Sequence, residues 1–208
     1  MLIVMIVLGA VSGWLSLLLC KKLIAARSET PVQKWYISNK SAPILWSVLG
    51  MAAFSLIELQ EITIYQKIEF IIVTLICLLI GSVDIAVKKI PNILLLVLIV
   101  TKTLFVIFNH SNVSFAQNLW GFIAASVIFV LPSLAKIKVG AGDIKLAAVI
   151  GLYLGINGFL QAMLIMAITI SLYGLVLMIR RLGSFKSLTA MGPYLALGFF
   201  VTLLFPLI

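Results

Sequence analysis

Charged residues are scarce in this chain. Asp, Glu, Lys and Arg make up 10% of its 208 residues, whereas hydrophobic residues make up 63%, and the mean hydropathy is +1.27. A water-soluble fold needs a polar surface, and too few polar residues are present to make one. The lipid bilayer is therefore the expected solvent. A spanning helix needs about 20 mostly apolar residues, so the length accommodates roughly seven to nine spans. We expect a single integral membrane domain over residues 1–208.

Cysteine and histidine are also nearly absent. Cys20 and Cys77 both fall inside apolar runs, and neither a CxxC motif nor a Cys/His cluster occurs. The sequence therefore predicts no zinc site, no disulfide framework and no cofactor. The only histidine, His110, lies in a polar stretch, where a solvated loop residue is favoured over a proton-transfer role.

Acidic residues are few, and 15 basic residues against 6 acidic ones give a net charge of +9. In a soluble protein this excess would suggest nucleic-acid binding, but no basic domain is present to hold a nucleic acid. The basic residues instead cluster in short loops, as the positive-inside rule expects. The first apolar run has no basic segment before it and no small-residue cleavage pattern after it. We therefore expect it to remain in the protein as a spanning helix.

The alternation of apolar runs with polar loops predicts an all-α membrane bundle of about eight transmembrane helices, with the N-terminus outside. Residues 21–42 then form a short basic cytoplasmic loop, and 13 of the 15 basic residues lie on the cytoplasmic side. The exceptions, Lys67 and Lys102, are expected near the outer side, where long side chains can snorkel to the interface. The predicted spans are residues 2–20, 43–59, 68–84, 91–108, 118–135, 144–157, 159–179 and 190–207.

Only two aspartates occur, Asp84 and Asp143, and the predicted topology places both at the cytoplasmic ends of helices. A carboxylate at the centre of a spanning helix costs roughly 2.5 kcal/mol or more. Two of them at equivalent depth therefore suggest a site. Two carboxylates that share one proton are the equipment of an aspartyl protease, in which one activates a water and the other polarises the scissile carbonyl.

Two other interpretations of the pair stay open on the residues alone. Both aspartates could be interfacial residues neutralised by neighbouring lysines. Alternatively, the carboxylates could line a proton or cation pathway, as in a proton-coupled transporter.

Three sequence elements carry a resemblance to a known family, and they occur in this order: Asp84 with Ile90-Pro91-Asn92; Gly140-Ala141-Gly142-Asp143-Ile144-Lys145-Leu146 with Gly151-Leu152-Tyr153-Leu154-Gly155; and Met191-Gly192-Pro193-Tyr194-Leu195-Ala196-Leu197-Gly198. In these elements the chain resembles the type IV prepilin peptidases, which belong to the GxGD class of intramembrane aspartyl proteases. The resemblance extends over about residues 75–208 and is weak in the N-terminal third.

This resemblance implies that Asp84 and Asp143 are the catalytic pair of an aspartic-type endopeptidase in a prokaryotic cytoplasmic membrane. Its partners would be precursors of type IV pilins or pseudopilins, whose short basic leader is removed at the cytoplasmic face. The resemblance therefore connects the chain with the type IV pilus and with protein secretion. Six further residues are expected to shape the site: Gly140, Gly142, Lys145, Pro91, Gly192 and Pro193.

Lys145 has two explanations at this stage. It could favour the ionised form of Asp143, or it could simply be a positive-inside anchor.

The loop at 21–42 departs from many bifunctional members of that family. Those members carry a larger cytoplasmic domain with paired CxxC motifs and also methylate the new N-terminus, whereas this loop is short and has no cysteine. Peptidase activity alone is therefore expected. A presenilin-like protease is disfavoured because neither a Tyr-Asp pair at the first aspartate nor a later Pro-Ala-Leu element occurs. A non-catalytic assembly subunit, which would tolerate loss of either carboxylate, is a further alternative.

Overall fold

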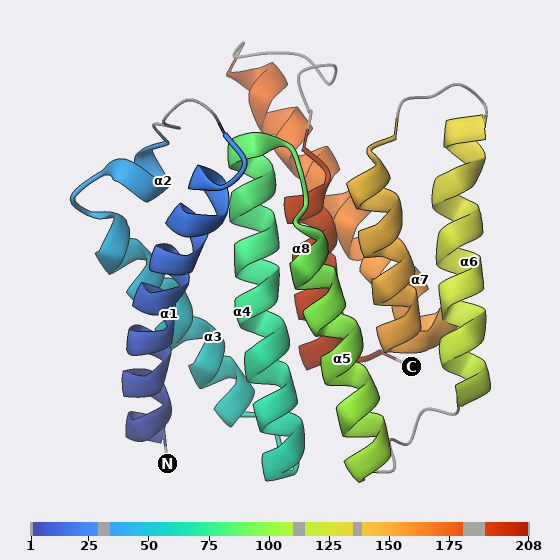
Figure 1. Cartoon of the computed structure of the whole chain (residues 1–208), viewed down its shortest axis with the longest axis horizontal. Coiled ribbons are helices and arrows are strands. Elements are labelled where there is room, and N and C mark those ends of the chain that lie inside the picture. The colour runs from blue at the N-terminus through green and yellow to red at the C-terminus, as the bar shows by residue number, and fades with distance from the viewer. Residues whose placement is uncertain (1, 29–33, 110–114, 135–138, 181–189, 208) are drawn as a thin grey trace.

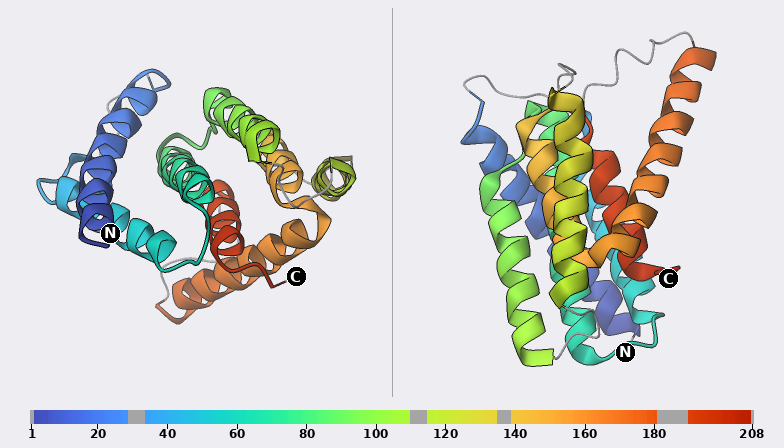
Figure 2. Two further views of the ribbon diagram at one scale, coloured as in Figure 1. Left: turned by 90° about the horizontal axis from the view of Figure 1, so that it is seen from below. Right: turned by 90° about the vertical axis from the view of Figure 1, so that its right-hand side faces the viewer.

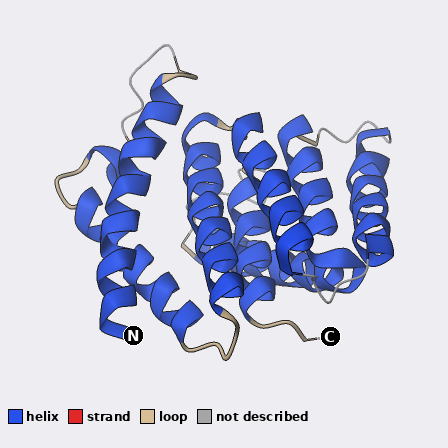
Figure 3. Ribbon diagram, turned by 60° about the horizontal axis from the view of Figure 1, so that its bottom comes forward, coloured by secondary structure: helices blue, strands red, loops and turns tan. Residues whose placement is uncertain are grey.

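The computed structural model of the chain is built from helices (Figure 1, Figure 3). The structure describes residues 2–28, 34–109, 115–134, 139–180 and 190–207, and within these ranges every regular element is a helix. The elements are α1 (Leu2–Ala25), α2 (Trp35–Ser38), α3 (Ala42–Glu58), α4 (Ile64–Val87), α5 (Asn92–Asn109), α6 (Phe115–Leu134), α7 (Ala141–Ile179) and α8 (Gly192–Leu204). The predicted all-α fold is confirmed for the described residues.

Four helices are long and apolar enough to cross a membrane: α1, α4, α6 and α7. Three shorter apolar helices, α3, α5 and α8, accompany them. Large apolar side chains such as Ile3 and Phe108, each 78% exposed, lie on the outside of the bundle, where a soluble protein would place polar groups. Together these features make the chain an integral membrane protein.

The long helices alternate in direction along the chain (Figure 1). The C-terminal end of α4 and the first turns of α7 and α8 therefore lie at one end of the bundle, shown at the top, whereas the start of α1 and the end of α8 lie toward the other. Viewed along the bundle, α4 and α8 lie between the α1–α3 pair and the group formed by α5, α6 and the first half of α7 (Figure 2). This arrangement gathers three distant chain segments at one end.

Helix α7 contains a break at Gly155, whose backbone (φ 71°, ψ −175°) is not helical. The chain reverses there, so the two halves of α7 correspond to the separate spans predicted at 144–157 and 159–179 (Figure 2). An extended backbone with positive φ is open essentially to glycine alone, which explains the residue at this position.

The first half of α7 packs closely on α6 through glycines. A Cβ atom on Gly151 would lie 2.2 Å from the Gly121 carbonyl oxygen, so the two backbones are nearly in contact. This is the close-packing role that the spacing of Gly151 and Gly155 suggests, since small residues let helices approach in a membrane. A short element was not predicted: α2 lies inside the 21–42 loop, where the Tyr36 hydroxyl donates to the Ser82 carbonyl oxygen of α4 at 2.9 Å.

Candidate active site

Asp84 lies in the last turn of α4 and is buried. The helix ends because Lys88 adopts a left-handed conformation (φ 53°, ψ 37°), with its N–H donating to the Asp84 carbonyl oxygen at 2.8 Å. Pro91 then follows before α5 begins at Asn92. The side-chain Oδ2 of Asp84 accepts a hydrogen bond from the Gly192 N–H at 3.0 Å. The first turn of α8 therefore holds this carboxyl group in place.

Asp143 lies in the first turn of α7. Gly140 precedes the helix in an extended conformation, and its carbonyl oxygen accepts from the Asp143 N–H at 3.0 Å. The start of a helix carries a partial positive charge, so a carboxylate is favoured there. The residue is partly exposed, yet its Oδ1 atom is buried and has no hydrogen-bond partner among the described residues. A buried oxygen without a partner is suited to a water or a substrate group.

The two carboxyl groups come from different helices. The loop after α4 packs against the start of α7, where a Cβ on Gly142 would lie 3.2 Å from the Ile90 Cβ. The ends of α4, α7 and α8 thus meet around the pair. The structure thus places both aspartates at the same end of the bundle.

Each aspartate has a glycine pressed against its side chain. A Cβ on Gly192 would lie 2.7 Å from Asp84 Oδ2, and a Cβ on Gly140 would lie 2.7 Å from Asp143 Oδ2. Real Cβ atoms essentially never approach other atoms this closely. Any side chain at either position would therefore displace the carboxyl group beside it.

Comparison with known protein families gives one match. The type IV leader peptidase family matches residues 70–179, which is slightly more than half of the chain and includes both aspartates. The chain belongs to the type IV leader peptidase family. It is accordingly a type IV leader peptidase-like protease. No curated protein and no solved structure matched the chain.

The leader peptidase match begins within α4 and ends with the last residue of α7, so it does not cover α8. Gly192 and Pro193, which were expected to shape the site, begin α8. Pro193 packs on α4, because a Cβ on Gly81 would lie 3.5 Å from the Pro193 Cα. Pro91 is buried in the loop before α5, and its carbonyl oxygen accepts from the Leu94 N–H at 3.1 Å. Both prolines thus lie where a helix starts, which is where proline is tolerated.

Lys145 lies one helical half-turn beyond Asp143 but is exposed and points elsewhere. Its Nζ donates to the Asn92 Oδ1 at 3.4 Å, a long hydrogen bond across to the start of α5. Among the described residues no ion pair joins Lys145 to Asp143. This placement gives Lys145 no direct contact with Asp143.

A second polar cluster was missed in the sequence. Glu69 of α4 is 8% exposed, and its Oε1 accepts from the Tyr153 hydroxyl of α7 at 2.6 Å. Lys102 of α5 reaches the same oxygen at 4.0 Å. The expectation that Lys102 snorkels outward is wrong, because its ammonium is directed inward at Glu69. The sequence did contain a signal for this cluster, because an acidic residue, Glu69, and a basic residue, Lys102, each lie inside an apolar run.

Metal coordination has no support within the described ranges, where no group of three or more His, Cys, Asp or Glu side chains could hold an ion. Cys20 and Cys77 are both free and buried.

Proposed function

We propose that this protein is an aspartic-type endopeptidase that removes the short basic leader from type IV prepilin or pseudopilin-like precursors at the cytoplasmic face of a prokaryotic cytoplasmic membrane. The observation that carries the proposal is that Asp84 and Asp143, the only aspartates of the chain, lie at one end of the bundle, where the loop after α4 packs on Gly142. Membership of the leader peptidase family supports the class of substrate. The single membrane domain is part of the same proposal.

Hydrolysis would use the pair as a proton-sharing unit. Two carboxyl groups in one site share a proton, because the second charge is disfavoured beside the first. The ionised carboxylate takes a proton from water, and the protonated one donates to the scissile carbonyl oxygen. The unpartnered Oδ1 of Asp143 leaves an acceptor free for the water, and the Gly192 N–H fixes Asp84. The missing side chain at Gly140 leaves room for the Asp143 carboxyl group, and the missing side chain at Gly142 lets the start of α7 approach Ile90.

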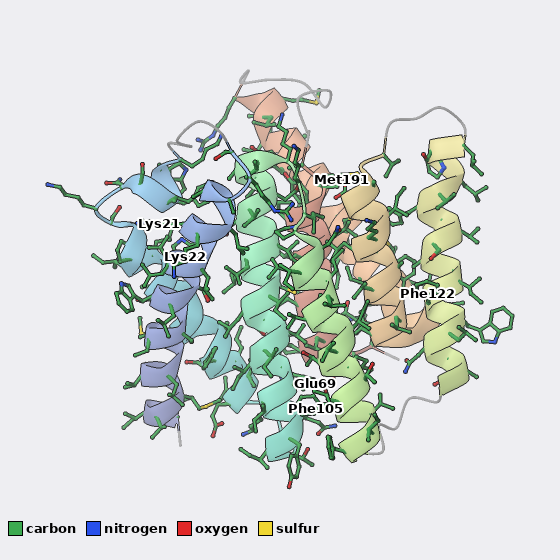
Figure 4. The ribbon with its side chains drawn as sticks, viewed as in Figure 1. Lys21, Lys22, Glu69, Phe105, Phe122 and Met191 are labelled. Carbon is green, nitrogen blue, oxygen red and sulfur yellow. The ribbon has the colours of Figure 1, made fainter. Side chains whose placement is uncertain are left out.

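The proposed orientation has the N-terminus outside and eight membrane segments, counting α7 as two and omitting α2. Basic residues support it: Lys21 and Lys22 near the end of α1, Lys88 and Lys89 after α4, and Arg180 after α7. These helix ends share the end of the bundle that carries the aspartates (Figure 1, Figure 4). Under the positive-inside rule this end is cytoplasmic, which is where a basic leader would lie. Four further basic residues that the predicted topology assigns to the cytoplasmic side lie outside the described residues: Lys136, Lys138, Arg181 and Lys186.

Two features limit the proposal to proteolysis. The stretch between α1 and α3 is short, and the whole chain has two cysteines, both within apolar helices. A zinc-bound cytoplasmic domain, and the methylation associated with it, are therefore not part of the proposed activity.

The test is cleavage of a co-expressed prepilin-type precursor in membranes by the native chain, Asp84→Asn and Asp143→Asn. The native chain is expected to release the leader, and each substitution is expected to abolish release while the protein still inserts. Glu61→Gln is the matched control, because Glu61 is exposed in the loop before α4, at the opposite end of the bundle. Cleavage that survives either aspartate substitution would refute the two-carboxylate mechanism and leave the transporter or non-catalytic interpretations.

A further inference from the structure

Tyr153 contacts every helix that contributes to the site. It lies on α7, which carries Asp143, and is 2% exposed. Its hydroxyl donates to Glu69 on α4, the helix of Asp84. Its ring packs edge-on against Phe199 of α8, with centroids 5.2 Å apart. The Lys102 ammonium of α5 lies 4.7 Å from the ring centroid, in the range of a cation–π interaction.

The Glu69–Tyr153 hydrogen bond directly links two helices whose main packing partners are other helices. Helix α4 packs mainly on α8, α1 and α5, and α7 packs mainly on α6, α8 and α5. The polar link lies far from the aspartates. Asp84 is 15 residues beyond Glu69, or about 22 Å at 1.5 Å per residue. Figure 4 shows Glu69 toward the lower part of α4, away from the upper end where α4 meets α8.

The desolvation cost of these buried charges favours a role in positioning the helices over a role in stabilising the fold. Burying a carboxylate and an ammonium requires desolvating both, and the attraction between them rarely exceeds that cost. The best-attested use of such a buried group is to fix register. Here the Oε1 of Glu69 accepts a hydrogen bond from the Tyr153 hydroxyl and lies 4.0 Å from the Lys102 Nζ, so groups from two other helices face it.

Because of the break in α7, the position of its first half against α4 must be fixed by contacts of that half alone. Gly155 follows Tyr153 by two residues and interrupts the helix. The first half of α7 therefore ends immediately after Tyr153 and is not held straight by the second half. A contact at Tyr153 fixes the lower end of this half-helix, whose upper end carries Asp143.

We propose that Tyr153, held by Glu69, is a positioning residue that sets the separation of the two aspartates by fixing the first half of α7 against α4. The inference rests on the proposed function, because the separation matters only if the two carboxyl groups act together. Tyr153 and Glu69 do not touch the reacting atoms.

The kinetic test is Tyr153→Phe, which removes only the hydroxyl. A misplacement of about 1 Å can reduce a rate about 100-fold. We expect kcat per folded molecule to fall about 10- to 100-fold, with KM changed less than about threefold. Tyr65→Phe is the matched control, because Tyr65 lies in the first turn of α4 but is 58% exposed. Its kcat should equal that of the native enzyme.

Two substitutions of Glu69 separate the effect of its hydrogen-bond acceptor from the effect of its charge. Glu69→Gln keeps a side-chain oxygen that can accept from Tyr153, whereas Glu69→Leu does not. Lys102 loses its charged partner in both variants, so the difference between them reports the acceptor. We expect Glu69→Gln to retain at least about tenfold more activity than Glu69→Leu. Equal activity of the two, or a Tyr153→Phe variant that loses thermal stability but keeps its kcat, would overturn the proposal.

A measurement without substrate tests the geometry independently. Spin labels at Ile85→Cys and Lys145→Cys, both exposed positions, report the separation of α4 and α7 next to the aspartates. The background carries Cys20→Ala and Cys77→Ala. We expect Tyr153→Phe to shift or broaden the distance distribution and Tyr65→Phe to leave it unchanged. An unchanged distribution in Tyr153→Phe would refute the positioning role, whereas failure of the native chain to cleave any precursor would refute the proposed function.

Discussion

Replacing Gly192 with alanine tests whether the position of Asp84 limits catalysis. The added Cβ would lie 2.7 Å from Asp84 Oδ2, 2.9 Å from its Cγ and 3.1 Å from its Cβ. Relief to an ordinary contact of 3.4 Å requires a shift of about 0.7 Å. The carboxyl group must move, and its hydrogen bond from the Gly192 N–H must lengthen or break. Since 1 Å can be worth about 100-fold, we expect kcat to fall about 10- to 100-fold.

The assay is steady-state cleavage of a prepilin-type precursor by purified protein in lipid, together with a thermal unfolding curve. Overpacking of this kind costs about 1–3 kcal/mol, so the midpoint is expected to fall while the protein remains folded. Gly81→Ala is the control in the same α4–α8 contact, because its Cβ would meet the Pro193 Cα at an ordinary 3.5 Å. That variant should keep its activity and gain up to about 1 kcal/mol of helix propensity.

Native kcat in folded Gly192→Ala would refute the reasoning. It would mean that the contact between the first turn of α8 and Asp84 does not define the geometry in which the reaction occurs. A loss of activity in Gly81→Ala equal to that in Gly192→Ala would assign the effect to general disturbance of the α4–α8 contact instead.

Two further substitutions test separate features. Gly155→Ala keeps the surrounding space, since the nearest atom would lie 3.5 Å from the new Cβ, but it forces alanine into a backbone with φ 71°. We expect a loss of about 1–3 kcal/mol in the free energy of unfolding, and an unchanged thermal midpoint would contradict this. Lys145→Gln removes an exposed charge whose hydrogen bond to Asn92 is 3.4 Å long, so kcat/KM should change less than about fivefold. A 100-fold loss of kcat/KM in cleavage assays would instead indicate that Lys145 acts on Asp143.

The sequence predicts that Asp84 and Asp143 lie at the same end of the bundle, because this placement depends on hydropathy and charge alone. Apolar runs long enough to span a bilayer, separated by basic loops, determine which helix ends share a side of the membrane. Two helices, α5 and α6, lie between Asp84 and Asp143 in the chain, and this even number brings both residues to the same end, as the helix directions in Figure 1 show. The glycines beside them follow from the motif, although only the structure reveals that Gly140 and Gly192 each touch a carboxyl group.

The polar cluster around Tyr153 could not be predicted in the same way. Whether Glu69 and Lys102 face lipid, water or each other depends on the rotation of each helix about its axis, and an almost uniformly apolar helix gives little information on rotation. The position of the chain reversal in α7 was similarly ambiguous, because Gly151, Gly155 and Gly158 all lie in the same stretch. The structure shows that the chain reverses at Gly155, whose backbone is not helical, whereas Gly151 serves close packing on α6.

The break at Gly155 also has a consequence for the lipid around the protein. Residues 141–154 form a half-helix about 21 Å long, and the 13 residues of α8 span about 20 Å. Both fall short of the roughly 30 Å hydrocarbon thickness of a typical bilayer. A bilayer thins beside a spanning segment that is too short for it. The rate of the proposed hydrolysis is therefore expected to respond to acyl-chain length in reconstituted vesicles.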